Sequence, residues 1–171
     1  MRRLAVLALG LCAVAAPAAT AQTAATLSAD AVVVTVGMTI ATLSQLNFGS
    51  VPKGVATTVA PNVAAAGEWQ ITGNSNAFVT ISFTLPTLLT NIQAQPGSTM
   101  PISFGAASAL WRRATNNPAG ATVFNPSVGT VGRIGPPANP NMYIWIGGTV
   151  TPAAAAKPGI YQGTIIVSLS Y

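Results

Sequence analysis

The side chains of this chain restrict the chemistry that it can perform. The sequence contains no histidine, one cysteine (Cys12) and only two carboxylates, Asp30 and Glu68. Without histidine there is neither a Ser-His-Asp relay nor an imidazole ligand for a metal ion. Two carboxylates can hydrolyse a glycoside when they face each other across a cleft, but Asp30 lies in an N-terminal arm and Glu68 on the polar face of a predicted strand. We therefore expect no catalytic residue, no metal site and no cofactor.

One local cluster has side chains that could bind a ligand. Trp111, Arg112 and Arg113 place an aromatic ring beside two guanidinium groups, a combination suited to an acidic polysaccharide or a lipid headgroup. The alternative is a buried Trp111 beside two solvated arginines, and we favour it. Trp69 and Trp145 could similarly line a sugar site, but packing in the core or on a sheet face is the simpler interpretation.

The first 21 residues have the pattern of a secretory signal peptide. A basic pair, Arg2-Arg3, precedes an apolar run from Leu4 to Ala16, and Ala19-Thr20-Ala21 is a small-residue cleavage site. Cleavage is expected before Gln22. The apolar run is shorter than the roughly 20 residues of a membrane span, so we expect no transmembrane segment in the mature chain. The predicted location is the periplasm, the cell surface or the extracellular space.

The mature chain would carry very few charges. Removing Arg2 and Arg3 leaves five of the seven basic residues, and subtracting the two carboxylates gives a net charge of +3. Cys12 leaves with the signal peptide, so no disulfide can form. No stripe of Lys and Arg is present, which argues against binding to nucleic acid. The remaining 150 of 171 residues suffice for one domain with a core.

The end of the chain has the clearest strand pattern. Ile165, Val167, Leu169 and Tyr171 alternate with more polar residues, as in a strand with one buried face. The apolar run of residues 142–150 predicts a second strand, antiparallel to the first. Proline and glycine punctuate the connection between them.

Further strands are expected along the rest of the chain. Residues 68–72 and 78–85 predict a β-hairpin around the Gly73–Asn76 turn. Shorter strands are predicted at 38–48 (with a bulge near Ser44-Gln45), 56–59, 100–104 and 122–124, one or two helical turns at 106–114, and a loop at 125–140. Many short strands separated by turn residues are typical of an all-β sandwich or barrel.

Several short motifs resemble a known family. They are Leu46-Asn47-Phe48-Gly49-Ser50-Val51, Ile71-Thr72-Gly73 with Val79-Thr80-Ile81, Ile146-Gly147-Gly148-Thr149-Val150, and Pro158-Gly159-Ile160-Tyr161-Gln162-Gly163-Thr164 with a strand ending at Tyr171. Over residues 38–171 the chain resembles the domain-of-unknown-function family 4402, which is similar to spore-coat-U-like and chaperone–usher pilin subunits.

The resemblance implies an immunoglobulin-like antiparallel β-sandwich, similar to a pilin, and a role in surface structures such as fimbriae. In pilins the fold lacks one strand, and the N-terminal extension of a neighbouring subunit supplies it. Residues 22–37 form an arm before the domain. Its candidate donor residues are Leu27, Ala29, Ala31 and Val33, which alternate with Thr26, Ser28, Asp30 and Val32. Such an arm could pair with its own domain or with a neighbour's.

The sequence therefore predicts an exported structural or adhesive cell-surface subunit, similar to a pilin of a fimbrium, that assembles by strand addition. Expected partners are further copies, related surface subunits and a periplasmic chaperone. The alternative is a monomeric secreted β-sandwich that binds a carbohydrate or another surface ligand. Polymerisation distinguishes the two, because a binding module should be a stable monomer.

Overall fold

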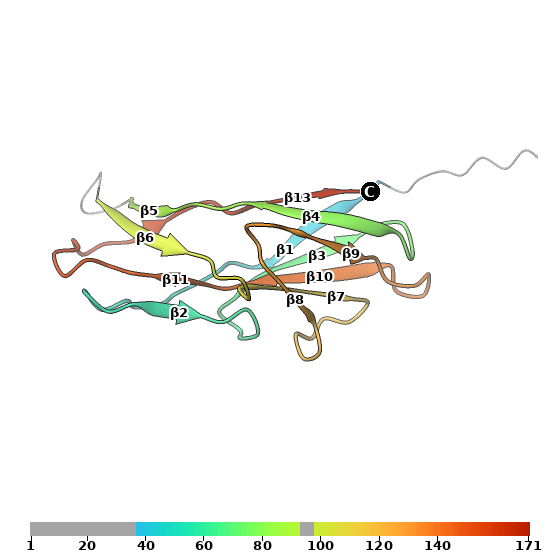
Figure 1. Cartoon of the computed structure of the whole chain (residues 1–171), viewed down its shortest axis with the longest axis horizontal. Coiled ribbons are helices and arrows are strands. Elements are labelled where there is room, and N and C mark those ends of the chain that lie inside the picture. Colours follow the sequence, from blue (N-terminus) through green and yellow to red (C-terminus); the bar gives the residue numbers. More distant parts are fainter. Residues whose placement is uncertain (1–36, 93–97) are drawn as a thin grey trace, which may run out of the picture. The chain divides into compact units, whose positions relative to one another are not determined.

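Antiparallel strands make up the regular structure of this protein (Figure 1). The computed structural model describes residues 37–92 and 98–171, all of which belong to one unit of the chain, Val34–Tyr171. Within these two ranges the secondary structure is β-strand, and no helix is long and apolar enough to span a membrane. An all-β fold with several antiparallel sheets is thus confirmed.

One of the two five-stranded sheets, which we call sheet I, supplies most of the buried residues of the main core. Its strand order is β1-β3-β10-β7-β8. The strands are β1 (Thr39–Ser44), β3 (Gly67–Thr72), β10 (Asn141–Ile146), β7 (Ala109–Arg113) and β8 (Thr122–Phe124). Alternation along these strands sends Ile71 and Ile144 to the inner face and Tyr143 and Trp145 to the outer face, where the two rings stack at 6.1 Å.

Two further sheets complete the domain. Sheet II has the order β12-β5-β6-β11-β2, and sheet III has the order β13-β4-β9. Sheet II contains β12 (Tyr161–Gln162), β5 (Leu88–Asn91), β6 (Thr99–Ser103), β11 (Gly148–Val150) and β2 (Thr57–Val59). Sheet III contains β13 (Ile166–Ser170), β4 (Phe78–Thr84) and β9 (Thr130–Arg133). In Figure 1, β4 and β13 run along one side of β1, β3 and β10.

Sheets I and III share one hydrophobic core. Ile71 and Ile144 from sheet I and Val79 and Ile81 from sheet III are all fully buried in the same cluster. Burying a side chain of this size stabilises the fold by roughly 1.5–3 kcal/mol. A second cluster, beneath sheet II, contains Leu89, Met100, Ile102 and Val150.

The hairpin expected at residues 68–85 was wrong, although both of its strands exist. β3 pairs with β1 and β10, whereas β4 pairs with β13 and β9. The physical reason is that Trp69, Ile71, Val79 and Ile81 all enter one core, so the turn carries the chain from sheet I to sheet III. The same applies to the closing pair, because β10 and β13 also lie in different sheets.

Two other expectations also need correction. The segment predicted as helical turns, 106–114, contains β7, which pairs with β10 and β8. The segment predicted as a loop, 125–140, contains β9, which pairs with β4. Gly132 within β9 resembles a turn residue, but a Cβ there would lie 2.7 Å from the Met142 sulfur and 2.9 Å from Ile81. Glycine therefore permits close packing at this position. The strands at β2 and β8 and the bulge near Ser44 are confirmed.

Gly147 allows a close crossing between sheets, which leads to a first prediction. A Cβ at Gly147 would lie 2.1 Å from the Val59 carbonyl oxygen and 2.8 Å from the Pro61 nitrogen, both backbone atoms that cannot rotate away. Gly147→Ala should lower the free energy of unfolding by about 3 kcal/mol, at the upper end of overpacking effects. Gly105→Ala is the matched control, since its Cβ would meet only the Ser108 hydroxyl at 3.6 Å. Urea unfolding of both variants tests this, and equal midpoints would contradict it.

Candidate functional site

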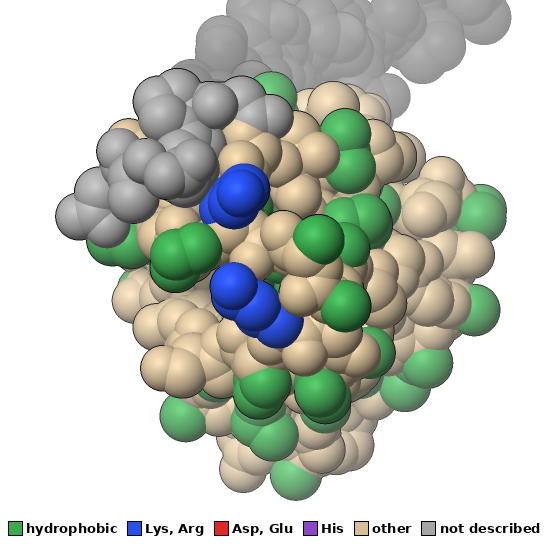
Figure 2. All heavy atoms as spheres, turned by 90° about the vertical axis from the view of Figure 1, so that its left-hand side faces the viewer, with side chains coloured by type: hydrophobic (Ala, Val, Ile, Leu, Met, Phe, Trp, Pro, Cys, Tyr) green, Lys and Arg blue, Asp and Glu red, His purple; other side chains and the backbone are tan. Residues whose placement is uncertain are grey.

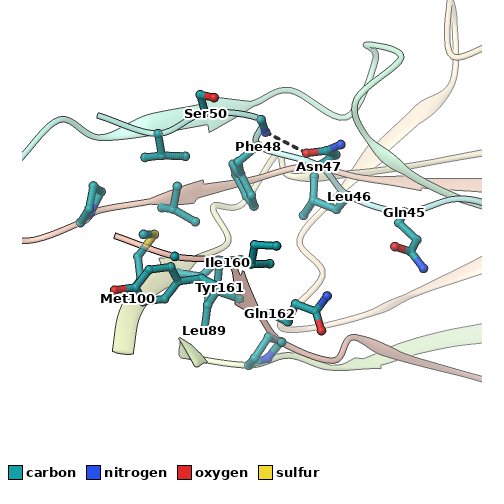
Figure 3. A pocket seen from close by; sticks show the side chains of 18 of the residues that line it. Gln45, Leu46, Asn47, Phe48, Ser50, Leu89, Met100, Ile160, Tyr161 and Gln162 are labelled. Carbon is teal, nitrogen blue, oxygen red and sulfur yellow. Dashed lines mark hydrogen bonds between the residues drawn. The ribbon is translucent and has the colours of Figure 1, made fainter. Parts of the chain in front are cut away.

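A long groove opens between two segments that flank the edges of the sheets. One wall comes from the chain after β1, residues 42–53, and the other from the chain before β13, residues 156–165. The groove has a volume of about 970 Å³. Figure 3 shows Leu46 and Phe48 extending from the first wall toward Ile160 and Tyr161 of the second.

The floor of the groove is apolar. Leu89, Met100, Ile102 and Val150 line it and belong to the cluster beneath sheet II, with Phe48, Val51 and Tyr161 packed against them. Trp69 contributes from sheet I. A hollow of this composition suits an apolar occupant, because polar groups placed there would lose their hydration without gaining many partners.

Both strands beside the groove are edge strands. In the described part of the chain, β1 pairs only with β3, and β13 pairs only with β4. Each therefore presents one row of backbone N–H and C=O groups without a ladder partner, as edge strands do. β1 and β13 belong to different sheets, so a further strand between them would add to an edge without disturbing an existing ladder.

The inward side chains of β13 are incompletely covered. Val167 and Leu169, with Ile165 just before the strand, point toward the core cluster and pack against it, so the predicted phase of this strand is confirmed. All three remain half-buried, whereas Val79 and Ile81 on the neighbouring β4 are fully buried. The inward side chains of β13 are thus less completely covered than those of β4.

The ends of β1 and β13 define the direction of the groove. Met38 and Tyr171 both meet Gly73, and the Tyr171 hydroxyl accepts a hydrogen bond of 2.9 Å from the Asn74 backbone N–H. β1 therefore begins where β13 ends, and the two strands run in opposite directions. The far end of the groove contains Lys53 and Lys157.

The tryptophan–arginine cluster does not form one surface. Trp111 points to the core, where its indole nitrogen is buried without a hydrogen-bond partner in the described residues. Arg112 lies on the opposite face and donates to the carbonyls of Asn117 (3.2 Å) and Ala119. Arg113 donates to the Asn76 side chain at 2.7 Å. Alternation along β7 puts Arg112 on the face opposite to Trp111 and Arg113. The structure therefore does not bring the three side chains together on one face, and ligand binding there stays a prediction.

Trp69, Trp145 and Glu68 lie in the core or against the outer face of sheet I. Trp69 is buried in the core and Trp145 is 3% exposed on the outer face of sheet I. Glu68 borders a small recess of about 160 Å³ with Trp145, and one of its oxygens is buried without a partner in the described residues. Among those residues no group of three or more His, Cys, Asp or Glu could hold a metal ion. Asp30 and the donor residues Leu27, Ala29, Ala31 and Val33 lie outside the described residues.

Comparison with known proteins assigns the family. A profile described as a domain of unknown function, DUF4402, matches residues 38–171. The chain belongs to the DUF4402 family. The resemblance inferred from the motifs is therefore confirmed over the predicted range. No curated protein matches the chain. Both walls of the groove lie within the matched range, so the groove is part of the DUF4402 domain itself.

Sequence reasoning did not identify the groove residues as a site. Leu46 and Phe48 follow the bulge in β1, and their alternation with the polar Gln45 and Asn47 is a detectable signal. Leu89 and Met100 give no comparable signal, because they reach the groove only through the pairing of β5 with β6.

Proposed function

We propose that this DUF4402 domain is an exported structural subunit of a bacterial surface structure, and that it assembles by inserting its N-terminal arm into the groove of another copy. The domain is then an immunoglobulin-like sandwich that lacks one strand. The observation that carries the proposal is the apolar groove beside the edge strands β1 and β13. An edge strand next to an apolar hollow invites association unless something covers it.

The length and pattern of the arm fit such a groove. Residues 22–36 extended as a strand would span about 50 Å, long enough to follow the twelve residues 42–53 of one wall, which would span about 40 Å if extended. Leu27, Ala29, Ala31 and Val33 would face the floor, and the half-buried Val167 and Leu169 would gain a neighbour. Small alanines suit the centre of a groove whose floor already holds large side chains.

Strand direction distinguishes exchange between copies from pairing within one chain. An arm that turned back at Gly37 into its own groove would approach Met38 while running the same way as β13, and would pair with it in parallel. An arm from another copy can run antiparallel to β13, like the missing strand of an immunoglobulin-like sandwich. In either case the arm runs antiparallel to one edge and parallel to the other, because β1 and β13 run in opposite directions, so the preference for exchange rests on the likeness to pilins. Exchange produces a head-to-tail chain that need not close.

Matched arm variants of the mature chain, residues 22–171, test the proposal. Ala31→Asp places a carboxylate on the arm face that would be buried, and should prevent polymers because an unpaired charge there is costly. Ser28→Asp adds the same charge to the opposite face and should leave assembly intact. Size-exclusion chromatography and electron microscopy provide the readout. Equal polymerisation of both variants would show that the arm is not the inserted strand.

The second candidate function is a monomeric secreted binding module for a carbohydrate or another surface ligand. One observation favours this binding module: a groove of about 970 Å³ could also hold a small ligand. A wild-type mature chain that stays monomeric at high concentration would support this alternative. In either case we propose no catalytic role for Glu68. A related surface subunit or a periplasmic chaperone would engage the same groove.

A further inference from the structure

We infer that the two lysines at the end of the groove recognise the acidic residue of the incoming arm and set the rate at which copies associate. This inference rests on the proposed function, because its partner is the arm of a second copy. Lys53 and Lys157 are the only lysines of the chain, and both line the groove with exposed side chains.

The loops that carry the two lysines lie against each other. A Cβ at Gly54, next to Lys53, would be 3.6 Å from Ala154, three residues before Lys157. The Lys157 carbonyl accepts a hydrogen bond of 2.8 Å from the Tyr161 hydroxyl, which ties this loop to the groove wall. The backbones of the two lysines therefore lie near the same end of the groove.

No acidic side chain of the described residues neutralises this end. The groove is lined without any Asp or Glu. Glu68, the carboxylate in the described part of the chain, lies in β3 on the face opposite to the groove-lining Trp69. Figure 2 shows a face of the molecule with basic side chains and no acidic one. The arginines are directed elsewhere, since Arg112 binds loop carbonyls and both Arg113 and Arg133 bind Asn76.

The arm carries the complementary charge. Between Gln22 and Val36 the only charged side chain is Asp30. In the inserted arm Asp30 would lie five residues, about 16 Å, from the lysine end of the groove. A strand whose only charged side chain is a carboxylate is attracted to the two lysines over a distance set by salt, about 10 Å at 0.1 M ionic strength and about 30 Å at 0.01 M. Exposed charges at the rim of an interface act mainly on the association rate. The lysines therefore accelerate insertion, and the apolar floor holds the inserted strand.

Assembly kinetics of the mature chain, followed by light scattering after dilution from denaturant, test this inference. At 10 mM salt, K53Q/K157Q should slow the initial rate roughly threefold to tenfold. The control S127E/V128E lowers the net charge by the same two units at exposed positions away from the groove, and should not slow assembly. At 0.5 M salt all rates should converge.

A charge exchange makes the test specific. K53E/K157E should assemble still more slowly than K53Q/K157Q, and adding D30K should restore the rate because the arm and the groove again carry opposite charges that attract at low salt. If the wild-type chain assembles at a rate that neither salt nor these substitutions alter, the lysine inference is overturned and the strand-addition proposal stands. If the wild-type chain does not assemble at all, both are overturned.

Discussion

A Val167→Asp variant is expected to lose about 3–4 kcal/mol of unfolding free energy, a large fraction of the roughly 5–15 kcal/mol that stabilises a typical domain. Val167 lies in the middle of β13, pairs in register with Phe83 of β4 and packs against the core shared by sheets I and III. A carboxylate at this position would lose the apolar contacts of valine and most of its hydration. Circular dichroism and urea unfolding of the mature chain measure the loss.

Ser168→Asp is the matched control for this variant. Ser168 is the next residue of the same strand, faces outward opposite Ser82, and is exposed. Its contact with the Ser82 hydroxyl uses the backbone carbonyl at 3.4 Å, which the substitution retains. The unfolding free energy should change by less than about 0.5 kcal/mol. Similar losses in both variants would mean that β13 is covered on both faces or has the opposite phase.

The period-two alternation of single strands was visible in the sequence, whereas strand pairing was not. The pattern at Ile165, Val167 and Leu169 predicted the correct inward face, because side-chain direction alternates strictly along a strand. It could not predict that β3 and β4 lie in different sheets. A turn such as Gly73–Asn76 can join paired strands or carry the chain between sheets. The choice depends on which core the flanking Ile71 and Val79 enter together.

Of the two parts of the candidate site, the sequence predicted the arm but not the groove. The arm was identified by its alternation and by its position before the family's domain, and it stays a prediction because it lies outside the described residues. The groove was not identified, since its floor combines Trp69, Leu89, Met100 and Val150 from distant parts of the chain. Such a surface exists only after three sheets have formed. The Trp111–Arg113 cluster illustrates the converse, because neighbours along a strand point to opposite faces.

The second prediction with a large expected effect concerns cross-linking, which depends on the direction of the inserted strand. Strand exchange antiparallel to β13 places Thr35 of one copy near Ala156 of the next, at the lysine end of the groove. Folding back within one chain places Thr23 there instead, about 40 Å along the arm from Thr35. Residues 22–171 contain no cysteine. In a protein of these residues, two introduced thiols and a bifunctional maleimide of about 10 Å therefore report on one contact only.

Cross-linking of Thr35→Cys/Ala156→Cys, compared with Thr23→Cys/Ala156→Cys, is the most direct measurement of the central claim. The first variant is expected to give a ladder of covalent oligomers on a denaturing gel, and the second little product. Cross-linked monomer from Thr23→Cys/Ala156→Cys, with no ladder from Thr35→Cys/Ala156→Cys, would contradict assembly by strand exchange and place the arm in the groove of its own chain.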